Sequence, residues 1–177
     1  MIVIVVLTGL CFLFRGWLYR HLVKYQSIGL RANYLAHTHN LIVYIDTNTG
    51  HEPRLDIKAV IKIALSLTSK QLNFTTGNNA NDPNILIDTK TANCIGYAAF
   101  CATTCNCLFK KYELFDWEAK PQIGQLYLMG TNVHQFFSSP FFKDHDFVLI
   151  VNKTTGETLA VDPTLNDYLY IDFVAIK

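Results

Sequence analysis

The segment from residue 93 to residue 109 constrains the fold more than any other part of the sequence. It reads NCIGYAAFCATTCNCLF, and its small residues recur at helical spacing. Asn93 stands where a helix N-cap is expected, so that Cys94 begins the helix. The segment therefore predicts a helix that starts at Cys94 and packs its small side chains against a sheet.

Length and charge limit the classes of protein that fit this chain. Its 177 residues correspond to one domain with one sizeable core. Half of the residues are hydrophobic and only 16% are charged, which excludes an intrinsically disordered chain. The formal net charge of +1 gives no electrostatic reason to expect nucleic acid as the main partner.

The cysteines argue against a disulfide scaffold and against a metal site. The chain has five of them, an odd number, and it is long enough to build a core without cross-links. Cys101, Cys105 and Cys107 lack a fourth ligand at a metal-binding spacing, so we expect no metal here. We expect these thiols to pack between the helix and the sheet.

The N-terminal residues carry a membrane-type signal. Residues 1–14 contain no charged residue, and Trp17 and Tyr19 follow the first arginine, Arg15. A bilayer core is roughly 30 Å thick, so a helix spans it here only if Arg15 snorkels toward the surface. Because neither a basic start nor a small-residue cleavage site is present, we expect residues 1–24 to form an uncleaved anchor.

Basic residues set the expected side of the membrane. Arg15, Arg20, Lys24 and Arg31 all precede the first acidic residue, Asp46, which favours a cytoplasmic domain by the positive-inside rule. An exported domain stays physically open, since large domains translocate despite flanking charge. The alternative to an anchor is a hydrophobic helix that packs on the domain.

Residues 25–177 contain no repeat, proline-rich linker or long charge run, so we treat them as one domain. A helix is predicted from Pro53 with an inward stripe formed by Leu55, Ala59, Ile63 and Leu67, helped by Val60 and Ala64. Residues 73–83 have the composition of a loop. Strands are expected at Leu41 to Ile45, Tyr112 to Trp117, and Gln125 to Met129. This order predicts an α+β fold with an antiparallel sheet.

A β-hairpin is predicted near the C-terminal end. His145 to Asn152 and Glu157 to Asp162 have strand patterns, and KTTG between them is a turn sequence. If Asn152 lies opposite Glu157, then Phe147 lies opposite Asp162 and His145 is one step away on the same face. A tighter loop pairs His145 with Asp162 directly. In both registers the two side chains share one face.

Cys94, His145 and Asp162 together form a candidate catalytic set. A cysteine at a helix start feels the positive end of the helix dipole, which favours the thiolate. A nucleophilic thiol also needs a base, and that base needs an acceptor that fixes its tautomer. Asp144 and Asp146 alternate with His145, so we expect their side chains to face the solvent.

The motifs ANCIGYA, KDHDFVLIV and LAVDPT, in this order, resemble the transglutaminase-like, papain-like superfamily. The resemblance covers about residues 55–165 and is most specific in the hairpin with VDPT. It implies a papain/transglutaminase-like core in which Cys94 is the nucleophile, His145 the general base and acid, and Asp162 the residue that orients the histidine. Asp146 and Phe147 stand where members often carry a tryptophan after the histidine, and Ala92 stands where many carry glycine.

This resemblance implies a cysteine peptidase, amidase or acyltransferase that acts on a peptide or protein substrate without a cofactor. The pattern does not choose between water and an amine as the group that resolves the acyl-enzyme. The backbone N–H of Cys94 supplies one oxyanion donor, and no second donor is assigned. The alternative function is a catalytically inactive domain of the same fold that binds a protein at the membrane.

Overall fold

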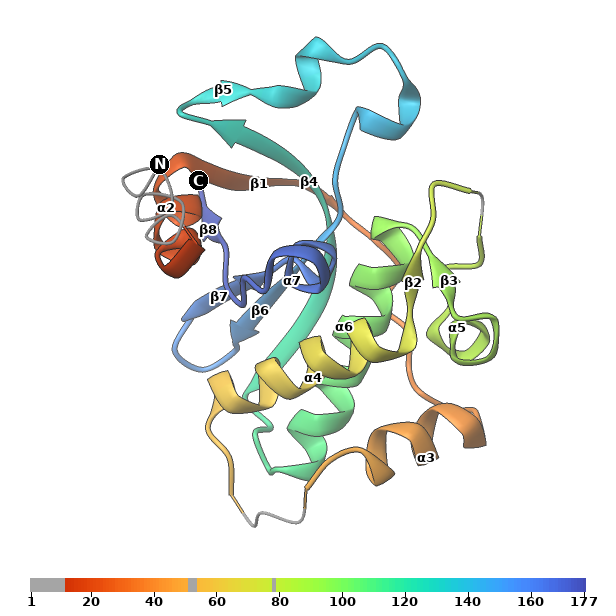
Figure 1. The fold of residues 1–177 in the computed structure, drawn as a ribbon. Helices are drawn as coiled ribbons and strands as arrows, with labels where there is room; N and C mark the ends of the chain where they lie inside the picture. Colours follow the sequence, from red (N-terminus) through yellow and green to blue (C-terminus); the bar gives the residue numbers. More distant parts are fainter. Residues whose placement is uncertain (1–11, 51–53, 78) are drawn as a thin grey trace, which may run out of the picture.

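The computed structural model describes residues 12–50, 54–77 and 79–177, and these residues form an α+β fold (Figure 1). Within them, six helices accompany a mixed, nearly closed six-stranded sheet. The α-helices are α2 (Arg15–Leu22), α3 (His39–Thr47), α4 (Ile57–Gln71), α5 (Pro83–Thr89), α6 (Cys94–Lys111) and α7 (Pro163–Leu169). Two short 3-10 turns, η1 (Val133–Phe136) and η2 (Pro140–Phe142), lie between the fifth and sixth strands.

The main sheet has the strand order β7-β6-β4-β1-β8, and β5 pairs with the end of β4. Its strands are β1 (Val23–Leu30), β4 (Trp117–Leu128), β5 (Thr131–Asn132), β6 (Phe147–Asn152), β7 (Thr158–Val161) and β8 (Ala175–Ile176). A separate parallel pair consists of β2 (Asn73–Phe74) and β3 (Thr91–Ala92).

The antiparallel sheet expected from the sequence is confirmed from β7 to β1 and is wrong for β8. Strand β8 runs parallel to β1, so the sheet is mixed. A bridge between Ala160 of β7 and Val174, just before β8, brings the two edges of the sheet together. The sheet is therefore nearly closed, and Tyr25, Phe147, Ala160 and Val174 form a small buried cluster.

Helix α6 is the central helix, as the small-residue segment predicts. It lies between α4 on one side and strands β4 and β6 on the other (Figure 1). Cys101 and Cys105 are completely buried, and both belong to the larger core cluster. The expected packing of these thiols inside the domain is confirmed, whereas Cys107 is only partly buried.

Helix α4 is present, but it begins later than the sequence analysis predicts. Asp56 caps it by accepting a hydrogen bond from the Ala59 N–H at 2.7 Å, so the helix starts at Ile57. Pro53, the predicted start, lies outside the described residues. Of the predicted inward face, Val60, Ala64 and Leu67 are buried, as predicted, whereas Leu55, Ala59 and Ile63 are only half-buried. The buried face is therefore rotated toward the remaining buried residues, which are Ile61, Leu65, Thr68 and Gln71.

The strand predicted at Leu41 to Ile45 is wrong, because these residues belong to helix α3. Leu41 and Ile45 are buried one helical turn apart, while Ile42 and Val43 between them are exposed. A run of five apolar residues fits a strand and a short helix equally well by pattern alone. The exposure of Val43 decides for the helix, because a strand that buried Leu41 and Ile45 would bury Val43 on the same face.

The strand predicted at Tyr112 to Trp117 is also wrong. Helix α6 extends to Lys111, and Glu113 adopts a left-handed conformation (φ 59°) in the turn that follows. The strand predicted at Gln125 to Met129 is the last part of β4, which starts at Trp117. Pro121 lies in this central strand although it has no N–H to donate. Its carbonyl accepts from the Arg31 N–H, just beyond the end of β1, and its nitrogen points to the same side. Pro121 is tolerated because the ladder with β1 has already ended there.

Of the predicted anchor, residues 1–24, residues 1–11 lie outside the described part of the chain. From Phe12 onward, α2 covers Arg15–Leu22, and Val23 and Lys24 already belong to β1. Among the described residues, no helix has the length and apolarity that crossing a membrane requires. Strand β1 was not predicted. In the chain, this first strand of the sheet precedes helices α3 to α7.

Candidate active site

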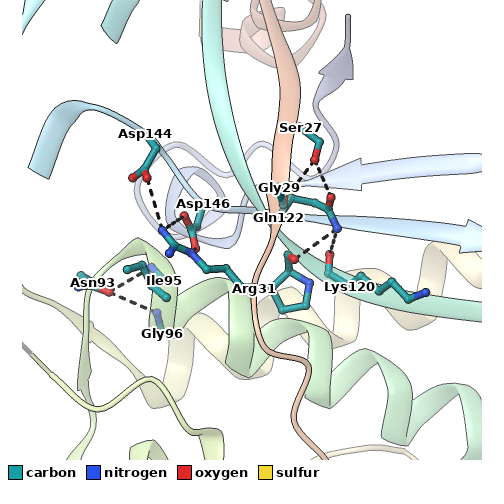
Figure 2. Close-up of polar contacts among 11 residues, drawn as sticks. Ser27, Gly29, Arg31, Asn93, Ile95, Gly96, Lys120, Gln122, Asp144 and Asp146 are labelled. Carbon is teal, nitrogen blue, oxygen red and sulfur yellow. Dashed lines mark hydrogen bonds and ion pairs between the residues drawn. The ribbon is translucent and has the colours of Figure 1, made fainter. Parts of the chain in front are cut away.

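Cys94 is the first residue of α6, as the sequence predicts. The side-chain oxygen Oδ1 of Asn93 accepts hydrogen bonds from the N–H groups of Ile95 (3.1 Å) and Gly96 (3.3 Å), which fixes the helix start (Figure 2). A methyl group at Gly96 would lie 2.7 Å from the Ala92 side chain, so only glycine lets α6 approach β3 this closely. The Cys94 side chain therefore lies at a rigid helix start and is 7% exposed.

The hairpin has the looser of the two predicted registers. Val148 pairs with Val161 and Val151 pairs with Thr158. His145 lies just before β6, and Asp162 lies just after β7 as the N-cap of α7. The His145 Nε2 and Asp162 Oδ2 atoms are 2.7 Å apart, so the expected contact between these side chains is confirmed.

A close backbone approach positions His145. The His145 N–H donates to the Gly124 carbonyl of β4 at 2.9 Å. A Cβ atom at residue 124 would lie 2.7 Å from the His145 carbonyl oxygen and 2.6 Å from the Phe147 ring. Glycine at position 124 is therefore required for the observed place of the histidine.

The charges of the site favour an ion pair. Burial lowers the pKa of His145, but the charge of Asp162, its hydrogen bond and the interaction with Cys94 outweigh burial and raise that pKa well above the usual value. Burial raises the pKa of Asp162, but the charge and hydrogen bond of His145 prevail and lower it. Asp162 thus stays ionised beside a histidine that holds its proton readily.

Two tyrosines that the sequence analysis did not single out complete this network. Tyr25 of β1 is fully buried, and its hydroxyl donates to Asp162 Oδ2 at 2.7 Å. The Tyr19 hydroxyl of α2 lies 2.7 Å from the Tyr25 hydroxyl. Burial raises the pKa of Tyr19 to about 12, so both hydroxyls keep their protons at neutral pH. A short hydrogen-bonded chain therefore joins α2 to Asp162.

The prediction that Asp146 faces the solvent is wrong. Asp146 is fully buried, and both of its oxygens accept from the Arg31 guanidinium, at 2.8 and 3.1 Å (Figure 2). Asp144 is partly exposed and contacts the same arginine at 3.5 Å. The alternation rule fails because these residues precede β6 and are not yet in the sheet.

Arg31 is a third residue that the sequence analysis did not single out as part of the site. The hydrogen bond to Asp146 raises the pKa of Arg31, and the charges of Asp146 and Asp144 act in the same direction. No sequence pattern marks the pair, because Arg31 and Asp146 lie 115 positions apart. Arg31 therefore anchors the segment that carries His145.

The other candidate centres lack this arrangement. A cavity of about 470 Å³ lies against α6 and includes Cys107, but no member of the Cys94, His145 and Asp162 set lines it. Among the described residues, no three His, Cys, Asp or Glu side chains gather in a way that would hold a metal ion. The polar network around Cys94 and His145 is thus the best candidate for chemistry.

Comparisons with family models, with curated proteins and with solved structures find no match for this chain.

Proposed function

We propose that the chain is a transglutaminase-like cysteine enzyme that acts on amide bonds of a peptide or protein substrate. The observation that carries the proposal is the 2.7 Å contact of His145 Nε2 with the buried Asp162. The Cys94 thiol begins α6, and its hydrogen bond and charge are among the causes that raise the pKa of His145. The contact with Asp162 leaves Nδ1 as the ring nitrogen that exchanges a proton with the thiol. The arrangement has the three parts of an activated nucleophile: thiol, base and orienting acceptor.

In the proposed reaction the Cys94 thiolate attacks the amide carbonyl carbon. The C–N bond breaks, His145 gives its proton to the leaving amine, and a thioester remains on Cys94. Water or a second amine then attacks the thioester while His145 takes up a proton and returns it to the sulfur. The N–H of Cys94 is one donor to the oxyanion, and no other donor is assigned.

The proposed place of action is a membrane surface. It rests on the uncharged segment of residues 1–14 and on the basic residues that follow it. The positive-inside rule favours the cytoplasmic side for the domain. The interaction with the membrane is proposed through this N-terminal segment alone.

The test is the pH dependence of alkylation of Cys94 by iodoacetamide in the full chain, followed by mass spectrometry of its peptide. We expect selective labelling well below pH ~8.5, the ordinary thiol pKa, and loss of that labelling in His145→Ala. Cys107 is an internal reference, because burial raises its pKa and it should label only at higher pH. His37→Ala, which changes an exposed histidine, is the matched control.

Two results would contradict the proposal. Labelling of Cys94 no faster than an ordinary thiol would favour the inactive, partner-binding domain instead. Equal labelling in the wild type and in His145→Ala would separate the thiol from its proposed base.

A further inference from the structure

A cavity of about 250 Å³ opens beside His145 and Asp162. Its walls come from four elements: α2, β1, the end of β4, and α7. The apolar lining residues are Leu126, Leu165 and Leu169, and the aromatic ones are Tyr19, Tyr25 and Tyr168. The volume suits one large side chain rather than a whole drug-sized ligand.

The walls of the cavity present carbon atoms to an occupant. The hydroxyls of Tyr19 and Tyr25 are already hydrogen-bonded to each other and to Asp162, and Tyr25 is fully buried, so neither hydroxyl is free for an occupant. The Thr164 hydroxyl oxygen, on a residue that also lines the cavity, is buried and has no hydrogen-bond partner among the described residues. With Leu126, Leu165 and Leu169 in its lining, the cavity suits an apolar group.

The proposed reaction indicates which part of the substrate would lie in this cavity. In the proposed reaction His145 protonates the departing amine, and later deprotonates the group that attacks the thioester. The amine side of the substrate must therefore lie next to His145, whereas the acyl group is bonded to Cys94. The cavity borders His145 and does not include Cys94.

We propose that this cavity is the amine-side subsite and that it selects amines with a large apolar side chain, such as leucine or phenylalanine. This assignment rests on the proposed function. The same subsite serves the leaving amine in the first step and an acceptor amine in the second. Helix α2 takes part in substrate selection because Tyr19 forms one of the walls.

The second step can be tested without knowledge of the natural substrate. An activated ester, N-acetylglycine p-nitrophenyl ester, acylates Cys94 of the full chain and releases p-nitrophenol. An added amine then attacks the thioester: the C–N bond forms, the C–S bond breaks, and the amine proton passes through His145 to the sulfur. The products from leucinamide, glycinamide and water are counted by mass spectrometry.

We expect leucinamide to capture the acyl group about 10-fold more efficiently than glycinamide, because only leucinamide fills the cavity. Leu126→Phe narrows the cavity and should lower this ratio at least about threefold. Leu128→Phe is the matched control, since Leu128 lies on the same strand, is exposed and does not line the cavity. The control should keep the wild-type ratio.

Equal capture of leucinamide and glycinamide would overturn the subsite while Cys94 still became acylated. The same conclusion would follow if Leu126→Phe and Leu128→Phe changed the ratio equally. Failure of the ester to acylate Cys94 would instead overturn the proposed function, and this assignment with it.

Discussion

The two sides of the candidate site are held by opposite kinds of interaction. On the α6 side, Asn93 caps a helix start through N–H groups two and three residues away. On the β1 side, Tyr25 reaches Asp162 over 137 positions and Arg31 reaches Asp146 over 115. The nucleophile is thus positioned locally, whereas its base and orienting acid depend on long-range contacts that form only in the complete fold.

The largest effect should come from the long-range ion pair. Arg31→Met leaves the fully buried Asp146 without its cation, and we expect the free energy of unfolding to fall by about 2–3 kcal/mol in urea denaturation. Burial raises the pKa of Asp146 and Arg31 opposes that rise, so the folded variant should take up a proton more readily. The loss should therefore be smaller at low pH than at high pH.

Lys120→Met is the control for this prediction. Lys120 pairs with Glu118 at 3.1 Å on the surface, where such a pair is worth about 1 kcal/mol or less. If both variants lost the same free energy of unfolding, the pair of Arg31 and Asp146 would contribute no more to stability than a surface ion pair.

A smaller effect is expected from Tyr25→Phe. The buried hydroxyl is a donor to Asp162, and its removal should cost about 1–1.5 kcal/mol. Because this hydrogen bond also lowers the pKa of Asp162, its loss leaves more of the carboxylate charge facing His145. We expect the pKa of His145, followed by NMR titration, to move upward.

Tyr127→Phe, which removes a hydroxyl that donates to Gln125 at 3.4 Å, serves as the comparison. It should leave the His145 titration unchanged. A Tyr25→Phe protein with the wild-type His145 titration would mean that Tyr25 fills space without tuning the site.

The smallest effect on stability should come from the local side. Asn93→Ala removes the cap of α6 and should cost about 1 kcal/mol, measured by urea denaturation. Asp56→Ala, which removes the cap of α4, should cost a similar amount. Only Asn93→Ala should also slow Cys94 alkylation, by roughly two- to fivefold, because it loosens the amides at the thiol. Equal alkylation rates in the two variants would contradict local control of Cys94.

The same contrast explains which parts of the site were predictable. Asn93 and Cys94 are adjacent in the chain, and His145 and Asp162 lie on one hairpin whose turn sets the register. Local patterns therefore predicted both halves of the candidate set. Tyr25 and Arg31 were not singled out because their partners are more than a hundred residues away, and no spacing encodes that contact.

The errors in the fold have a related cause. The segment from Leu41 to Ile45 is apolar in either a strand or a helix, and only its packing on the core selects the helix. Strand β1 follows helix α2 directly, and no turn residues mark its start. Its first residues, Val23 and Lys24, were therefore assigned to the apolar N-terminal segment. Tertiary contacts, rather than local preference, decide both cases.

The parallel pairing of β1 with β8 affects the order in which the sheet is completed during synthesis. Among the described strands β1 comes first in the chain, and its neighbour β8 comes last. Until residues 175 and 176 have been made, the edge of the strand that carries Tyr25 stays open. Because Tyr25 donates to Asp162, the surroundings of this buried hydrogen bond are complete only after every described strand has been synthesised.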